Sequence, residues 1–153
     1  MPIIGSHAKR LLSGVMNLLT GHYIPYVSAS FNKEHFQDLL RLTRGQWRGW
    51  NLVLFLDRAS AHTAGESQAL AAELQIELRW LPTACPELNV MDCLWRHSKD
   101  EIVANEPMPN LEDTVNRVIS YLDALTGYER LLKAGVFSDG FWLADVRDAL
   151  LSK

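Results

Sequence analysis

Two aspartates and a histidine are the residues whose types and spacing could carry out chemistry. Asp57 directly follows the apolar run Leu52–Leu56, and Asp92 lies near the start of a helical pattern, with 34 residues between the two aspartates. Ligands of α/β sheets gather at the carboxyl ends of strands, so Asp57 is predicted at such an edge, and the intervening chain is long enough to bring Asp92 there. Paired carboxylates suit Mg²⁺ or Mn²⁺, which can activate a water or a 3′-hydroxyl in phosphodiester chemistry. His62, five residues after Asp57, could contact a phosphate or a metal-bound water.

Each of these residues also has an ordinary structural interpretation. An aspartate at a strand end is often a turn or helix-cap residue, and Asp92 could pair with Arg96 one turn later. A lone loop histidine such as His62 is more often a surface or helix-start residue. The residues alone therefore leave both a metal site and an incidental arrangement open.

The elements that must position these residues follow from the hydrophobic pattern. The pattern predicts a β-hairpin over residues 9–29, a helix over 32–45 and a buried strand over 52–56. A short helix over 65–74 and a second strand over 76–80 follow, and then two longer helices, one over 88–102 and one from 110 on. The strand, helix and strand between residues 52 and 80 form a unit typical of α/β folds. One or two short helices are expected to complete the apolar C-terminal part.

Composition narrows the function classes. The 153 residues are 48% hydrophobic, enough for one core and too few for two comfortable domains. Fifteen basic against 18 acidic residues give a net charge of −3, so any contact with nucleic acid must be local. Cys85 and Cys93 form no CxxC pair, which favours a reducing cytosol. No apolar run reaches the roughly 18 residues of a membrane span, and no secretory signal precedes the hairpin, so a soluble cytoplasmic protein is expected.

Two stretches carry a family resemblance. Residues 52–62 read Leu-Val-Leu-Phe-Leu-Asp-Arg-Ala-Ser-Ala-His, and residues 81–95 read Leu-Pro-Thr-Ala-Cys-Pro-Glu-Leu-Asn-Val-Met-Asp-Cys-Leu-Trp. The first resembles the strand-and-turn of mariner-like bacterial insertion-sequence transposases of the DDE endonuclease superfamily. The second resembles their Leu-Pro-x-x-x-Pro-x-Leu-Asn-Pro-Ile-Glu-x-x-Trp segment, and the spacing of the two carboxylates is also similar. The resemblance covers about residues 5–125 of a single partial catalytic domain, residues 1–153, with a C-terminal helical tail over residues 126–153.

The resemblance implies a fold, a chemistry and a set of partners. The fold would be a ribonuclease-H-like mixed sheet flanked by helices, and the activity would be Mg²⁺- or Mn²⁺-dependent cleavage and joining of DNA by an assembly of two or more copies. The partners would be transposon ends and target DNA, and the protein would associate with the nucleoid when bound to them. Asp57 would be the second metal-binding carboxylate and Asp92 the third. His62 and Asn89 would line the site, and Trp95 would anchor its helix in the core.

The chain also departs from the family pattern. Arg58 stands where the family commonly has asparagine, Val90 replaces a proline, and Ala84 and Cys85 replace a Tyr-Ser pair. A cation at position 58 would compete electrostatically with a metal ion unless it contacts a DNA phosphate.

A first catalytic aspartate is absent from the sequence that precedes the hairpin. In the family this residue lies on a central first strand, whereas Met1–His7 contains no acid, and Glu34 and Asp38 follow the exposed face of a helix. We therefore expect two sub-sheets with unpaired inner edges. An upstream segment would supply the missing strand, the first aspartate and a helix-turn-helix region.

Three functions remain open from the sequence. One is a DDE-type transposase catalytic domain, incomplete in this chain. The second is an inactive remnant that serves at most as an oligomerisation or DNA-associating module. The third, an unrelated ribonuclease-H-like nuclease, would need a complete acidic site.

Overall fold

The computed structural model of the chain describes residues 11–82, 89–105, 111–138 and 141. These residues form four strands, β1 (Leu11–Met16), β2 (Tyr23–Ser28), β3 (Leu52–Leu56) and β4 (Ile76–Trp80). They also form six helices, α2 (Lys33–Gln46), α3 (Ser60–Thr63), α4 (Gly65–Glu73), α5 (Val90–Asn105), α6 (Leu111–Asp123) and α7 (Gly127–Lys133). The predicted mixed α/β class is confirmed. The short helix α3 was not predicted.

The described strands form two separate two-stranded sheets. The β1–β2 pair is antiparallel, from Leu11 opposite Ser28 to Met16 opposite Tyr23. The β3–β4 pair is parallel, with Leu56 beside Trp80 at its carboxyl end. This division agrees with the expected two sub-sheets, while the ribonuclease-H-like arrangement of a complete sheet stays a prediction.

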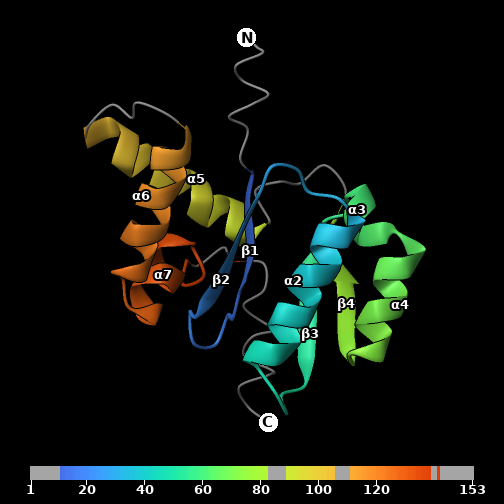
Figure 1. Cartoon of the computed structure of the whole chain (residues 1–153). Helices are drawn as coiled ribbons and strands as arrows, with labels where there is room; N and C mark the ends of the chain where they lie inside the picture. Colours follow the sequence, from blue (N-terminus) through green and yellow to red (C-terminus); the bar gives the residue numbers. More distant parts are fainter. Residues whose placement is uncertain (1–10, 83–88, 106–110, 139–140, 142–153) are drawn as a thin grey trace.

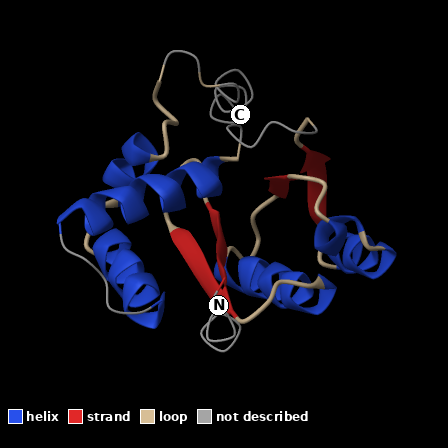
Figure 2. Cartoon of the chain, turned by 90° about the horizontal axis from the view of Figure 1, so that it is seen from above, coloured by secondary structure: helices blue, strands red, loops and turns tan. Residues whose placement is uncertain are grey.

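Each sheet has its own helices and its own core (Figure 1). Helices α5, α6 and α7 lie against the hairpin, and we call these five elements the hairpin half. Helices α2, α3 and α4 gather around β3 and β4, and we call these the strand-pair half. A view at right angles shows the two pairs of strands standing apart (Figure 2). The fully buried Leu94 and Leu122 lie in the core of the hairpin half, and Leu40 lies in that of the strand-pair half.

A third, smaller cluster joins the two halves. Val15 of β1 packs against Leu39 and Trp47 of the α2 region, and all three are buried. The ring of His22, next to the hairpin turn, meets Trp47 edge-on with 5.8 Å between ring centroids. Partly buried side chains from both halves pack against these three residues, namely Ile24, Tyr26, Phe31, Leu52 and Leu54.

Local sequence explains the boundaries of α2. The Asn32 side chain accepts a hydrogen bond from His35 N, and Asn32 N donates to His35 Nδ1, which closes a reciprocal cap. At the other end Arg44 donates to the carbonyl oxygens of Leu74, Gln75, Trp47 and Trp50. One guanidinium thus ties the end of α2 to the α4–β4 turn and to the entry of β3.

Two further predictions can be compared with the structure. No helix in the described residues is long and apolar enough to cross a membrane. Helix α7 lies within the predicted C-terminal tail, whereas residues 139–140 and 142–153 of that tail, like residues 1–10, fall outside the described part.

Candidate active site

Asp57 lies directly after β3 and is held by its own sequence neighbours. Its Oδ1 accepts a hydrogen bond from Ala59 N at 3.0 Å. His62 Nδ1 lies 3.0 Å from Asp57 Oδ1 and 3.0 Å from the Asp57 carbonyl oxygen. With its proton on Nδ1, the imidazole donates to this pair of oxygens. Within the described chain Asp57 Oδ2 makes no hydrogen bond, so this oxygen is the one left for another ligand.

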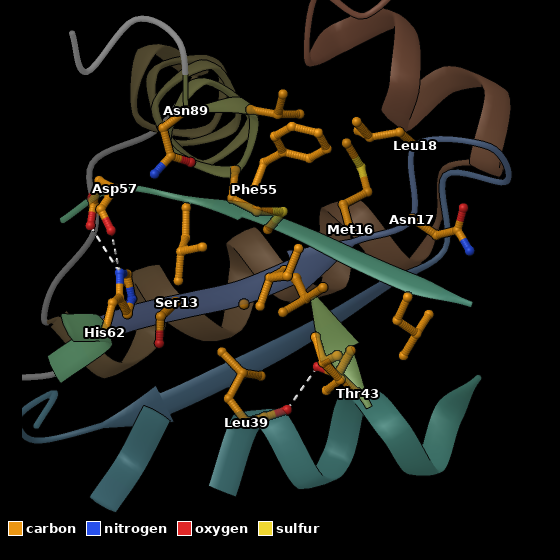
Figure 3. A pocket seen from close by; sticks show the side chains of 18 of the residues that line it. Ser13, Met16, Asn17, Leu18, Leu39, Thr43, Phe55, Asp57, His62 and Asn89 are labelled. Carbon is orange, nitrogen blue, oxygen red and sulfur yellow. Dashed lines mark hydrogen bonds and ion pairs between the residues drawn. The ribbon is translucent and has the colours of Figure 1, made fainter. Parts of the chain in front are cut away.

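His62 is fixed by aromatic side chains as well as by Asp57. Its ring lies 4.5 Å from the Phe36 ring and 6.0 Å from the Phe31 ring, measured between centroids. Only 16% of its side chain is exposed, against 49% for Asp57. The histidine therefore links the aspartate to the core of the strand-pair half, beside the cavity shown in Figure 3.

Asn89 and Asp92 come from the start of α5, in the hairpin half. Asn89 Oδ1 accepts a hydrogen bond from Asp92 N at 3.2 Å, as a residue capping a helix does. The cap fixes the first turn of α5 although Val90 replaces the family's proline. Asp92 does not pair with Arg96, whose guanidinium instead contacts Cys93 Sγ at 3.7 Å.

The two carboxylates act on each other electrostatically. Burial of the carboxyl, followed by the negative charge of Asp57, raises the pKa of Asp92, while Arg96 and His62 oppose the shift. Much of the Asp92 residue is nevertheless exposed. A divalent cation would relieve both causes, because it replaces lost hydration and neutralises the repulsion.

All four predicted site residues line one cavity of about 460 Å³. Asp57, His62, Asn89 and Asp92 contribute polar groups. Most of the remaining lining is apolar, and every residue of β1 from Leu12 on and every residue of β3 contributes to it. Figure 3 shows the cavity between the ribbons of β1 and β3, with Asp57, His62 and Ser13 toward one end and Met16 and Asn17 toward the other. The polar groups thus meet where β3 ends.

Trp95 anchors α5 on the hairpin, as predicted. Its ring lies over Gly14, where an added Cβ would stand 3.2 Å from Trp95 Cζ2 and 2.4 Å from the Ile24 carbonyl oxygen. The ring also meets that of Tyr23 edge-on, 6.1 Å between centroids. Asp92 is one helical turn before Trp95, so this contact sets the position of the carboxylate.

Arg58 contacts the Trp80 ring and, in the described part of the chain, pairs with neither carboxylate. Its guanidinium carbon lies 5.6 Å from the centroid of the Trp80 ring on β4, and among the described residues it forms no ion pair with Asp57 or Asp92. Trp80 was not recognised from the sequence as a site residue, because the alternating pattern of β4 assigned it to the core.

The donor set fits a hard divalent cation only in part. Carboxylate oxygens are suitable ligands for Mg²⁺ or Mn²⁺. Among the described residues, however, no group of three or more histidine, cysteine, aspartate or glutamate side chains could hold a metal ion. Asp57 and Asp92 would supply two ligands, and a third protein ligand would have to come from elsewhere.

Comparison with known proteins identifies the family of the chain. The family model described as DDE superfamily endonuclease matches residues 4–115, which include both aspartates, His62 and Asn89. The chain is also similar to the uncharacterized protein y4pE/y4sA of Sinorhizobium fredii (strain NBRC 101917 / NGR234), with 30% identity over 95 residues. That match covers 62% of this chain and 66% of the relative. The chain belongs to the DDE superfamily of endonucleases.

Proposed function

We propose that this chain is the catalytic domain of a DDE-type transposase, which cleaves DNA and transfers the cut strand in a metal-dependent reaction. The observation that supports this best is that Asp57 and Asp92 line one cavity and are near enough for the charge of Asp57 to raise the pKa of Asp92. Two carboxylates that converge at the end of a strand and can hold metal ions are typical of phosphodiester chemistry.

Mg²⁺ or Mn²⁺ would be held by Asp57 and Asp92. When bound, such an ion polarises a water or a 3′-hydroxyl and stabilises the leaving oxygen of the phosphodiester. His62 holds Asp57 Oδ1, so Oδ2 is directed to the ligand position, and Asn89 fixes the turn that carries Asp92. These two residues orient the carboxylates and need not touch the reacting phosphate.

The proposed site needs a third carboxylate, which we propose comes from an upstream segment. In the described part β1 pairs only with β2 and β3 only with β4, and an apolar cavity lies between β1 and β3. A strand added there would pair with both and could present an acid beside Asp57, since strand addition to sheet edges is a common mode of recognition. The same segment would carry a helix-turn-helix for DNA.

Partners and location follow from this function. The substrates would be transposon ends and target DNA, which requires two or more copies of the chain to hold paired ends. The protein would act in the bacterial cytoplasm, at the nucleoid when DNA is bound.

An inactive remnant is the second candidate, in which the chain serves as an oligomerisation or DNA-associating module. The observation in its favour is that the described residues bring together only two of the carboxylates that a metal site requires. Arg58 and Val90, which depart from the family pattern, agree with this candidate.

Calorimetric titration of the chain with Mg²⁺ and with Mn²⁺ tests the proposed site. We expect saturable binding that is lost in both Asp57→Ala and Asp92→Ala. The control is Asp100→Ala, which removes an exposed carboxylate of the same helix outside the cavity and should leave binding unchanged. Binding that ignores the first two substitutions would refute the site. A further result would favour the incomplete enzyme over the remnant: the chain binds metal without cleaving DNA, and cleavage appears when an upstream segment is added.

A further inference from the structure

Arg58 and Trp80 form a pair at the edge of the site. Arg58 is exposed and immediately follows Asp57, while the half-buried Trp80 is the last residue of β4. Because Leu56 and Trp80 are partners in the parallel pair, the two side chains leave the sheet at the same edge. The guanidinium lies over the indole, with 5.6 Å between the guanidinium carbon and the ring centroid.

This support leaves the hydrogen-bond donors of Arg58 available. Within the described residues Arg58 donates no hydrogen bond and joins no ion pair, and its guanidinium lies over the indole of Trp80. Such a cation–π contact favours one orientation of the side chain even at an exposed site. A planar fork of N–H groups thus stands in solvent beside Asp57.

Arg79 provides the contrast within the same strand. It precedes Trp80, and side chains alternate along a strand, so it leaves β4 on the opposite face. Its guanidinium is paired with Glu77. The two arginines carry the same charge a few residues from the site, but only Arg58 has free donors on the side where Trp80 lies.

A phosphate group matches this fork best, because the guanidinium can bind two phosphate oxygens side by side. We propose that Arg58, supported by Trp80, binds a backbone phosphate of the DNA strand in the Asp57–Asp92 site, next to the phosphate that is cut. The identity of the ligand rests on the proposed function, while the binding site itself rests on the geometry of this pair. An arginine beside a metal-binding aspartate then serves to bring in the anionic substrate.

Salt-dependent DNA binding tests this inference without any catalytic step. Fluorescein-labelled single-stranded and duplex oligonucleotides of one sequence are titrated with the full chain at several NaCl concentrations, without divalent metal. Loss of one phosphate contact reduces the slope of log K against log[salt] by about 0.7 for a single strand and about 0.9 for a duplex. We expect this reduction in Arg58→Ala, with roughly tenfold weaker binding at low salt.

Matched variants separate the phosphate contact from general charge and from folding. Arg58→Lys should keep the slope and lose part of the affinity, since the charge stays and the fork does not. Trp80→Phe should keep both, whereas Trp80→Leu should keep the slope and weaken binding. Arg79→Ala should match the unmodified chain in slope and affinity.

An Arg58→Ala slope equal to that of the unmodified chain would overturn the inference. Equal reductions in Arg58→Ala and Arg79→Ala would also overturn it, because charge alone would then explain binding, and so would failure of the unmodified chain to bind either oligonucleotide. The metal titration with Asp57→Ala and Asp92→Ala fails or succeeds independently of these results, so a failed inference can be told from a failed function.

Discussion

The two halves of the molecule hold their carboxylates in different ways. In the strand-pair half Asp57 is fixed by Ala59 N and His62, within five residues of itself. In the hairpin half Asp92 depends on Trp95, whose ring rests on Gly14 of a strand far away in the sequence. One carboxylate is therefore positioned by local contacts, and the other by the docking of a helix on a hairpin.

This difference matters because the site needs both halves at once. Asp57 and Asp92 face the same cavity only if the cluster around Val15, Leu39 and Trp47 holds the two halves in their relative position. Asp57 is held by contacts with its sequence neighbours, whereas Asp92 is held by the packing of its helix on the hairpin. Changes in core packing should therefore displace the carboxylate of Asp92 more than that of Asp57.

The largest expected effects come from truncating the two cores. Leu94→Ala in the hairpin half and Leu40→Ala in the strand-pair half should each lower the free energy of unfolding by about 2–5 kcal/mol, because both side chains are fully buried. Urea denaturation measures the change. Leu132→Ala and Leu42→Ala, at residues 53% and 49% exposed, are the controls and should change it by less than about 0.5 kcal/mol. If one of these two substitutions lowers the free energy of unfolding only slightly, the half that contains that leucine lacks a core of its own.

The second prediction concerns the docking of α5. Gly14→Ala would place a Cβ 2.4 Å from the Ile24 carbonyl oxygen and 3.2 Å from Trp95, so it should destabilise the chain by about 1–3 kcal/mol and weaken metal binding through displacement of Asp92. Differential scanning calorimetry and the Mg²⁺ titration measure the two effects. Gly45→Ala is the opposite case, because its Cβ meets nothing within 4 Å and the residue lies in α2. It should stabilise the chain by about 0.5–1 kcal/mol. Unchanged metal binding in Gly14→Ala would contradict the role given to Trp95.

A third prediction tests the hydrogen bond that closes the hairpin half. Tyr23 OH donates to Asp123 Oδ1 at 2.6 Å, so Tyr23→Phe should cost about 1 kcal/mol in urea denaturation at neutral pH. Tyr26→Phe, whose hydroxyl bonds Asp38 at an exposed position, should cost less.

The same tyrosine predicts a pH dependence. Burial, followed by the hydrogen bond to Asp123, raises the pKa of Tyr23 above its ordinary value. The folded chain therefore holds this proton more tightly than the unfolded chain, and the contribution is complete below the ordinary tyrosine pKa of about 10 and is lost as the pH rises toward the folded pKa. The difference between the unmodified chain and Tyr23→Phe should shrink over that alkaline range; a difference that stays constant there would exclude the linkage.

The smallest expected changes in stability come from replacing each aspartate of the site by asparagine, and the two changes should have opposite signs. Asp57→Asn weakens the contacts with His62 and Ala59 N and should lower stability by about 0.5–1.5 kcal/mol. Asp92→Asn should raise stability slightly at neutral pH, since the raised pKa of Asp92 means that its charged form is disfavoured in the folded chain. That gain should vanish as the pH falls below the ordinary aspartate pKa of 3.8, where the carboxyl is protonated in both states. Thermal melts of both variants at several pH values provide the measurement, and a loss of stability in Asp92→Asn would show that the carboxylate is held as Asp57 is.

The sequence by itself determined what depends on near neighbours. The apolar run before Asp57 identified a strand and its carboxyl end, and the apolar periodicity from residue 88 identified the helix α5. The strand was predicted to be buried, but only Leu56 of β3 is buried, because a cavity lies beside the strand. The two stretches around these aspartates also pointed to the family. Such features depend on backbone propensity and on contacts within a few residues, so they can be read along the chain.

Only the tertiary structure decided which groups meet. The packing of Trp95 on Gly14 places Asp92, the contact of Arg58 with Trp80 joins the ends of β3 and β4, and the two sheets enclose the cavity between β1 and β3. Each of these arrangements joins residues that are distant in sequence. The cavity and the contact of Trp95 with Gly14 depend on how side chains fill the space between packed elements. No local pattern encodes that space.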